Sequence, residues 1–281
     1  MPWALSDDVD VFADRAWKLL AGDPAEQTVA LSIVASLRAG QRWSDVPPVF
    51  GWYAQAGEVR GAVCMTPPFE LVLADVPDDT VAALVRTLRD EDVAVPGVNG
   101  AVPTVERFAQ AWLEGTDLRP RTTFEQRLYA LGTLRMPEPP APGRGRPGGE
   151  DEAELAARWM RAFQEETGVH STDVASAARA GIADGRLWLW EDEDGAPVSL
   201  ASRTPAAAGV ARIAPVYTPP EARRRGYGAA VTAACTADAQ ARGVDHVVLF
   251  TDLANPTSNS VYQRIGFRPL SDRRVVRFED H

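Results

Sequence analysis

Apolar residues recur along the first half of the chain with two kinds of spacing, which predict helices and strands in turn. Intervals of three and four residues favour amphipathic helices, and short apolar runs favour strands. The predicted helices cover residues 7–21, 27–39, 78–89 and 102–114. The predicted strands cover residues 49–55, 59–65, 70–76, 93–98 and 122–134. This succession indicates an α/β fold.

A comparable series of elements follows residue 150. Predicted helices cover residues 151–166, 171–183, 229–242 and 255–266, the last with Asn255 as its N-cap and Pro256 at its first position. Predicted strands cover residues 187–191, 197–203, 209–217, 244–251 and 275–278. Residues 244–251 form an apolar, β-branched run, which is typical of a buried parallel strand. We therefore expect a second α/β domain.

The two halves are joined by a segment rich in proline and glycine. Residues 136–149 read MPEPPAPGRGRPGG and have no apolar periodicity. Proline removes backbone donors and glycine removes conformational preference, so we expect no regular element here. Arg144 and Arg146 are interpreted as solvated linker residues. The expected domains are residues 1–135 and 151–281, with residues 136–150 as the linker.

Composition narrows the class of protein. The chain has 281 residues, 45% of them hydrophobic, which is enough for two ordinary cores. A net charge of −10 argues against a nucleic-acid partner and weakly favours a cationic substrate such as an amine. Cys64 and Cys235 lie in apolar segments, and we expect them to be reduced core residues.

The N-terminal segment gives no sign of export. Acidic residues follow Met1-Pro2-Trp3, and neither a basic region nor an apolar region of a signal peptide is present. No stretch reaches 18 consecutive apolar residues. We expect a cytoplasmic protein with no membrane partner, acting as a monomer or a homodimer.

The stretch with the most specific chemistry joins the predicted strand 209–217 to the predicted helix 229–242. It contains the run Arg223-Arg224-Arg225-Gly226-Tyr227-Gly228. A helix N-terminus presents free N–H groups to an anion, glycines let a phosphate approach the backbone, and guanidinium groups add fork-shaped donors. The run lacks the Gly-Lys-Ser/Thr of a Walker A loop and the Rossmann pattern of glycines. A phosphate site is therefore predicted, with a solvated arginine-rich turn as the alternative.

The spacing Arg223-x-x-Gly226-x-Gly228 resembles the Arg/Gln-x-x-Gly-x-Gly/Ala signature of the GNAT superfamily, the acetyl-CoA-dependent N-acyltransferases. Residues 255–267 also resemble the Asn…Ser…Tyr…Gly-Phe helix of that family. The resemblance covers about residues 151–278 and departs at Arg224, where many members have glycine. It implies a mixed-sheet GNAT fold of the α/β (α+β) class, with acetyl-CoA as the acetyl donor.

The first half has the same order of elements and resembles a second, diverged GNAT domain; an unrelated α/β accessory domain is the alternative. Its strand-to-helix loop reads Asp75-Val76-Pro77-Asp78-Asp79-Thr80. Three aspartates without a glycine would repel a pyrophosphate. We therefore expect tandem GNAT-like domains, of which the first has lost the cofactor site.

The resemblance also implies which residues contact acetyl-CoA. In the family, the strand bearing Val216 separates from its neighbour and the pantetheine amides pair with the exposed backbone; Pro215 removes a donor at this point. The implied cofactor contacts are Val216, Tyr217, Thr218, Arg223, Arg224, Arg225, Gly226, Tyr227, Gly228, Ala229, Asn255, Ser258, Asn259 and Tyr262.

The catalytic expectations rest on proton transfer. Tyr262 lies where the family often places a general acid, and a phenol can protonate the departing thiolate. Glu191 and Asp252 are candidates for the base that deprotonates the amine, as are His170 and His246, although His246 adjoins a buried strand and is interpreted as structural. The sequence shows no cluster of metal ligands, so no metal is expected.

Three functions are compatible with these residues. The main hypothesis is transfer of an acetyl group from acetyl-CoA to the amine of a small molecule. The first alternative is a protein or peptide N-acetyltransferase, and the second is a sensor that binds acyl-CoA without catalysis. The sequence does not identify the acceptor.

Overall fold

The computed structural model describes residues 3–168 and 173–280, which form two compact units. Within these residues, the first unit contains 3–128, 252–254 and 270–280, and the second contains 129–168, 173–251 and 255–269. The strands β6 (Arg119–Leu131) and β12 (Phe267–Glu279) contribute residues to both units. The sequence had instead placed all of residues 151–281 in one domain.

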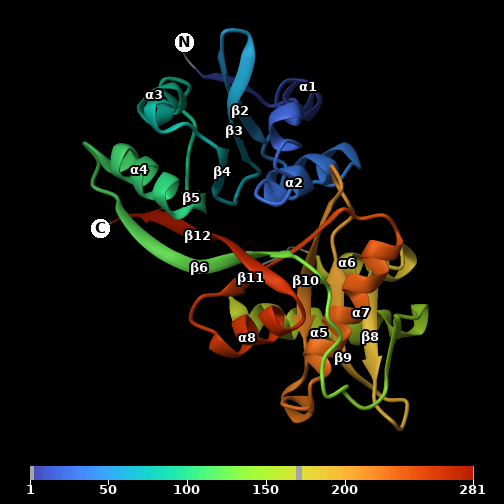
Figure 1. Cartoon of the computed structure of the whole chain (residues 1–281). Helices are drawn as coiled ribbons and strands as arrows, with labels where there is room; N and C mark the ends of the chain where they lie inside the picture. The colour runs from blue at the N-terminus through green and yellow to red at the C-terminus, as the bar shows by residue number, and fades with distance from the viewer. Residues whose placement is uncertain (1–2, 169–172, 281) are drawn as a thin grey trace. The chain divides into compact units, whose positions relative to one another are not determined.

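The first unit is a sheet with helices on both faces. Its strands follow the order β1-β2-β3-β4-β5-β12-β6, with β4 parallel to β5 and β12 antiparallel to β5. Figure 1 shows α1 and α2 on one face and α3 and α4 on the other. The bounds are β1 (Ala4–Ser6), α1 (Val9–Leu20), α2 (Thr28–Arg38), β2 (Val49–Gln55), β3 (Glu58–Met65), β4 (Leu71–Asp75), η1 (Asp78–Thr80), α3 (Val81–Asp90), β5 (Gly97–Ala101) and α4 (Val102–Leu113).

The last residues of the chain complete the core of the first unit. Val276 and Phe278 are buried with the apolar residues of β3, β4, α3 and α4. Ion pairs also hold β12 in this unit: Arg274 pairs with Glu106 at 2.8 Å and with Glu125 at 2.7 Å. The further ion pairs of β12 in this unit are Asp272–Arg127, Arg273–Glu26, Arg277–Glu70 and Glu279–Arg121.

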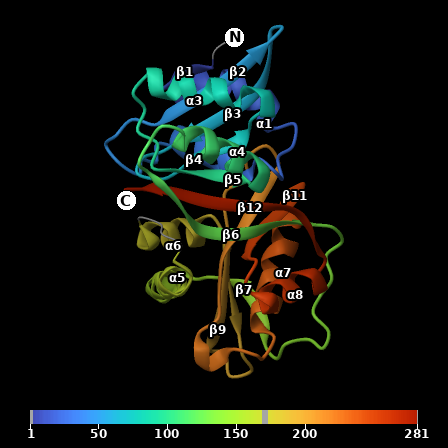
Figure 2. The same ribbon diagram turned by 90° about the vertical axis from the view of Figure 1, so that its left-hand side faces the viewer.

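The second unit has the same layered arrangement. Its strands follow the order β11-β10-β9-β8-β7, with β10 parallel to β11 and the other described pairs antiparallel. Figure 2 shows α5 and α6 on one side of these strands and α7 and α8 on the other. The bounds are β7 (Arg144–Pro147), η2 (Glu150–Glu152), α5 (Ala153–Thr167), α6 (Val174–Ala183), β8 (Leu187–Glu191), β9 (Pro197–Arg203), β10 (Val210–Tyr217), η3 (Pro220–Ala222), α7 (Tyr227–Ala241), β11 (His246–Asp252) and α8 (Pro256–Arg264).

Most of the predicted elements are present, with shifts of a few residues at their ends. The strand expected at residues 93–98 begins later, at Gly97, because Pro96 precedes it. The strand expected at residues 275–278 extends over Phe267–Glu279, and β1 was not predicted. The start of the helix expected at residues 171–183 lies partly outside the described residues. Cys64 and Cys235 are buried and free, which confirms the expectation of reduced core cysteines.

The prediction that residues 136–149 form no regular element is wrong. Residues 144–147 form β7, which pairs antiparallel with β8. Arg146 binds Glu191 and Glu152, so it is not a solvated linker residue, whereas Arg144 pairs with Glu191 at 2.9 Å but its side chain is 78% exposed. The strand was missed because its alternating arginines give no apolar periodicity. Ion pairs of these arginines with glutamates stabilise it in place of apolar burial.

The ion pairs of β7 stabilise the folded protein more at neutral pH than at acidic pH. Hydrogen bonds from Arg146, and then from Arg144, hold the pKa of Glu191 below its usual value, and Arg146 also lowers the pKa of Glu152. A carboxyl group whose pKa is depressed on folding stabilises the folded state above its unfolded pKa, and this contribution is lost as pH falls through the folded pKa.

Among the helices of the described ranges, none is long and apolar enough to cross a membrane.

We predict that Arg146→Ala lowers the thermal unfolding midpoint at pH 7 and speeds amide hydrogen exchange in residues 144–147. The variant leaves two carboxylates without their shared guanidinium. The difference in midpoint from the wild type should shrink as pH falls below the ordinary glutamate pKa of about 4.3, because both carboxylates become protonated. A difference that persists unchanged to pH 3 would contradict this account of β7.

Candidate functional site

The site predicted from the sequence begins where β10 and β11 separate. The two strands pair only from Val210↔His246 to Arg212↔Val248. Beyond Arg212, β10 continues to Tyr217 and pairs with β9, with an irregularity between Ile213 and Val216. The edge of β10 that faces away from β9 therefore has backbone groups with no strand partner among the described residues. This confirms the expected separation of the strands.

The loop after β10 leads directly into the N-terminus of α7. Gly226 precedes the helix with φ of 84°, in the left-handed region that favours glycine. The first helical hydrogen bond runs from the N–H of Ala230 to the carbonyl of Gly226, at 3.0 Å. No side chain within the described residues caps this end. The N–H groups of Tyr227, Gly228 and Ala229 are thus left without intrahelical acceptors, as an anion site requires.

Gly228 lies close to the side chain of Thr218. A Cβ at this position would lie 3.3 Å from the Oγ1 of Thr218. Thr218 is itself held by the hydroxyl of Ser199, at 2.8 Å, and Ser199 also donates to the carbonyl of Tyr217, at 3.0 Å. The buried Ser199 therefore fixes the end of β10 against the first turn of α7.

Arg223 is directed away from the helix N-terminus. Its Nε donates to the carbonyl of Thr218 at 2.8 Å, and its Nη2 pairs with Glu166 at 2.7 Å. Tyr217 also donates to Glu166, at 3.2 Å, and its ring lies under the guanidinium of Arg223. Arg223 thus anchors the loop to α5. The role of Glu166 was not predicted, because the sequence does not distinguish a glutamate that binds a distant arginine from one that is only solvated.

Arg224 and Arg225 remain available to a ligand. Both side chains are exposed, and neither has an ion pair or hydrogen bond within the part of the chain that the structure describes. Arg224 has φ of 64°, which turns the chain toward the start of α7. Two guanidinium groups, free N–H groups and the positive end of the helix dipole suit a pyrophosphate.

The start of α8 forms a hydrogen-bonded group with β6. Asn255 caps the helix by accepting from the N–H of Ser258 at 3.0 Å, as predicted. Asn259 donates to the carbonyl of Asn255 at 2.8 Å and accepts from the hydroxyl of Tyr129 at 2.9 Å. The fully buried Tyr129, which was not predicted, thereby orients Asn259.

Tyr262 is the predicted general acid. Its side chain is half-buried and meets the ring of Phe267 edge-on, with centroids 6.3 Å apart. Burial raises the pKa of Tyr262 to about 12, so the phenol stays protonated at physiological pH. No hydrogen bond of its hydroxyl to another described residue is present. The role of general acid remains a prediction.

The candidates for the general base differ in their surroundings. Glu191 is engaged by Arg144 and Arg146, and its lowered pKa makes it a weak base. Asp252 is exposed and accepts from the N–H of Ala254 at 2.8 Å. His246, which was interpreted as a structural residue beside a buried strand, is exposed at the start of β11. His170 lies outside the described residues, and no group of metal-ligating side chains occurs among those described.

Arg212 was missed by sequence analysis. It is the last residue of β10 that pairs with β11, and it points to the face opposite that of Ile213. Its Nη1 is buried with no hydrogen-bond partner among the described residues, and burial lowers the pKa of Arg212 to about 10. An arginine within the apolar run 210–217 was the signal in the sequence.

The corresponding loop of the first unit has the opposite charge. Between β4 and α3, Asp75, Asp78 and Asp79 are exposed, and Asp78 pairs with Arg107. Burial, and then the charge of Asp23, raise the pKa of Asp75. Carboxylates at the start of a helix occupy the position that an anion would need. The loss of a cofactor site in this unit stays a prediction that these charges favour.

We predict that Arg212→Met raises the free energy of unfolding by about 1 kcal/mol, because methionine buries no uncompensated charge in the same space. Chemical denaturation at pH 7 measures the change. Arg203→Met is the contrasting variant, since Arg203 is buried against Asp238 at 2.8 Å and its loss should destabilise the fold. If Arg212→Met destabilised the protein as much as Arg203→Met, the guanidinium of Arg212 would have a favourable partner after all.

Comparison with known proteins agrees with this geometry. Residues 153–267 match the model of the acetyltransferase (GNAT) family. A mycothiol acetyltransferase of Beutenbergia cavernae is 29% identical to this chain. That match covers 59% of this chain and 58% of the relative, so the chain spans less than two thirds of the relative's length.

Solved structures with the same fold extend over nearly the whole chain. A GCN5-related N-acetyltransferase from Kribbella flavida has a TM-score of 0.58 with 21% identity, and it covers 93% of this chain and 96% of its own. A tandem GNAT protein from the clavulanic acid biosynthesis pathway has a TM-score of 0.55 with 14% identity, and the coverage is 99% and 98%. Residues 153–267 thus match the acetyltransferase (GNAT) family model, and the chain shares the fold of GNAT proteins over nearly its whole length.

Proposed function

We propose that the second unit binds acetyl-CoA and transfers its acetyl group to the amine of a small molecule. One observation carries the proposal: the uncapped N-terminus of α7 follows directly from the edge of β10 that β11 leaves unpaired. An anion site and an extended set of backbone donors and acceptors are thereby joined by one short loop. This combination fits a carrier with a pyrophosphate at one end and amides along its arm.

The geometry supports the following residues as contacts of acetyl-CoA. The N–H groups of Tyr227, Gly228 and Ala229, with the guanidinium groups of Arg224 and Arg225, suit the pyrophosphate. The backbone from Val216 to Thr218 suits the amides of pantetheine. Arg223, Tyr217 and Ser199 would act indirectly by fixing the loop.

Transfer of the acetyl group to an amine requires proton transfers to and from the reacting atoms. Acetyl-CoA supplies an acetyl thioester, whose carbonyl carbon forms a bond with the acceptor nitrogen as the carbon–sulfur bond breaks. The acceptor nitrogen would release one proton to water as the amide forms, Tyr262 would deliver its own proton to the sulfur of the departing thiolate, and a proton from water would restore the phenol. Its raised pKa keeps that proton in place until negative charge develops nearby. Backbone N–H groups on the free edge of β10 would polarise the carbonyl oxygen.

A small-molecule acceptor is proposed by analogy with the relative named as a mycothiol acetyltransferase. The net charge of −10 favours a cationic amine. Release of free CoA measured across small amines and peptides separates these acceptors. Tight binding of acetyl-CoA with no turnover on any amine would identify the protein as a sensor and overturn the proposal.

We predict that the double variant Arg224→Gln/Arg225→Gln weakens acetyl-CoA binding by about tenfold or more, because charge-assisted hydrogen bonds to phosphate are lost. Isothermal titration calorimetry at low salt measures the effect, which should diminish as ionic strength rises. Arg15→Gln is the control, since Arg15 is an exposed arginine of the first unit. Equal losses in both proteins would remove the loop from the cofactor site.

We predict that Tyr262→Phe lowers kcat by about 100-fold and leaves the Kd for acetyl-CoA unchanged within about twofold, as loss of a general acid implies. In the wild type, deprotonation of Tyr262 should not reduce kcat below about pH 11, because its pKa is raised to about 12. Steady-state kinetics from pH 6 to 10.5 provide the profile. Unchanged turnover in the phenylalanine variant would exclude Tyr262 as the acid.

A further inference from the structure

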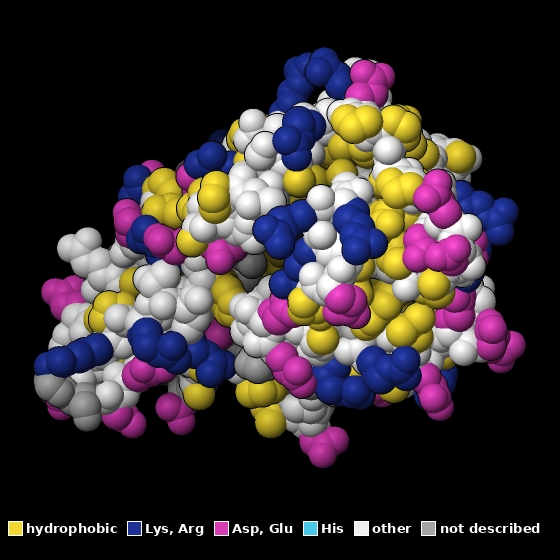
Figure 3. Space-filling view, turned by 90° about the horizontal axis from the view of Figure 1, so that it is seen from below, with side chains coloured by type: hydrophobic (Ala, Val, Ile, Leu, Met, Phe, Trp, Pro, Cys, Tyr) yellow, Lys and Arg dark blue, Asp and Glu magenta, His cyan; other side chains and the backbone are white. Residues whose placement is uncertain are grey.

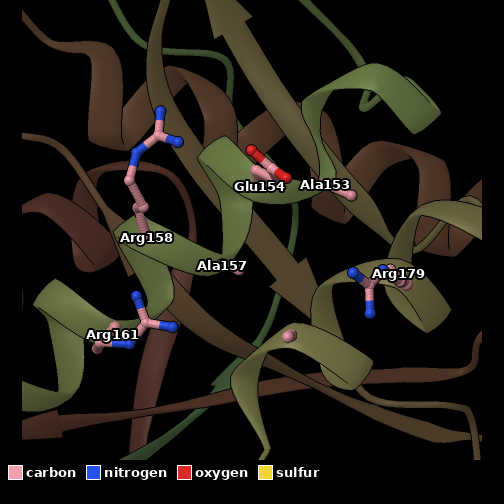
Figure 4. A pocket seen from close by; sticks show the side chains of 7 residues that line it. Ala153, Glu154, Ala157, Arg158, Arg161 and Arg179 are labelled. Carbon is pink, nitrogen blue, oxygen red and sulfur yellow. The ribbon is translucent and has the colours of Figure 1, made fainter.

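A groove between α5 and α6 lies apart from the loop at α7. Its volume is about 300 Å³. Alanines form its floor, and Figure 4 shows Arg158 and Arg161 from α5 at one side and Arg179 at the other. The lining residues are Ala153, Glu154, Ala157, Arg158, Arg161, Ala175 and Arg179. None of them belongs to the loop from Thr218 to Ala229, so the groove is separate from the proposed cofactor site.

The arginines of the groove lack the partners that most arginines have in this protein. Arg158, Arg161 and Arg179 are exposed, and none has an ion pair or hydrogen bond with another described residue. Hydrogen bonds from Ser176 lower the pKa of Asp173, and the charge of Arg179 adds a smaller effect.

The positive charge of the groove is a local feature. The protein as a whole has a net charge of −10, and Figure 3 shows basic and acidic side chains interspersed over the face in view. Glu154 is the acidic side chain that lines the groove, against three arginines. Like charges three residues apart on one helix, as at Arg158 and Arg161, destabilise it slightly, so a ligand that neutralises them would relieve the repulsion.

We propose that the α5–α6 groove binds a small phosphorylated molecule through Arg158, Arg161 and Arg179. Guanidinium groups match phosphate oxygens with paired hydrogen bonds, and donors from two helices surround a ligand better than one helix does. The alanine floor lets such a ligand approach the helices closely. A volume of about 300 Å³ is enough for a phosphate ester of modest size.

Inorganic pyrophosphate is a suitable probe, titrated calorimetrically at constant ionic strength. The Arg224→Gln/Arg225→Gln protein is the background, so that the loop at α7 contributes little. In this background, adding Arg158→Gln and Arg179→Gln should weaken pyrophosphate binding by about tenfold or more. Adding Glu154→Gln should strengthen it several-fold, because a carboxylate that opposes the ligand is removed.

Arg15→Gln in the same background is the matched control, because it removes one exposed arginine of the first unit. Unchanged binding after Arg158→Gln/Arg179→Gln, or an equal loss with Arg15→Gln, would overturn the proposal. Glu154→Gln that fails to strengthen binding would also contradict it. Thermal unfolding midpoints confirm that each variant is folded, as expected for substitutions of exposed side chains.

This site and the proposed acetyl transfer can fail separately. Arg158→Gln/Arg179→Gln in the otherwise wild-type protein should bind acetyl-CoA with unchanged affinity, because the groove shares no residue with the α7 loop. If the wild type did not bind acetyl-CoA and the groove variants still lost pyrophosphate, only the proposed function would be wrong. Loss of acetyl-CoA binding in the groove variants would show instead that the two sites are not independent, which contradicts the present proposal.

Discussion

The free N–H groups at the start of α7 are the constraint on which the arrangement of the second unit depends. A helix end that no side chain caps is costly unless water or a ligand satisfies it, so the surrounding residues must keep it open. Gly226 supplies the backbone turn, Arg223 is drawn toward Glu166, and Ser199 holds the end of β10 in place. The open helix end is thus maintained by contacts made beside it.

Much of this arrangement could be predicted, because the signals are local. The periods of apolar residues gave the helices and strands, and Asn255 followed by Pro256 gave the start of α8. Gly226 and Gly228 marked the loop at the start of α7, since glycines at the start of a helix leave its N–H groups accessible to a ligand. The GNAT fold of both halves was likewise implied by the order of the elements, and the solved structures show it.

The parts that were missed depend on contacts between residues far apart in the chain. Glu166, Tyr129 and Ser199 resemble ordinary helix or strand residues until the fold brings their partners near. The strand β7 was missed because arginines and Glu191 stabilise it without any apolar period. Polar contacts between residues far apart in the chain leave no regular spacing in the sequence. Buried faces of helices and strands do, because apolar residues recur along them at fixed intervals.

The place of β12 in the first unit bears on the order in which the protein can mature. Val276 and Phe278 lie in the core that α3 and α4 cover, between strands made more than a hundred residues earlier. During synthesis, the N-terminal half therefore leaves the ribosome with a gap between β5 and β6 and with apolar surface uncovered. Its folding cannot finish before the final strand emerges, so the half that is translated first is the one that is completed last.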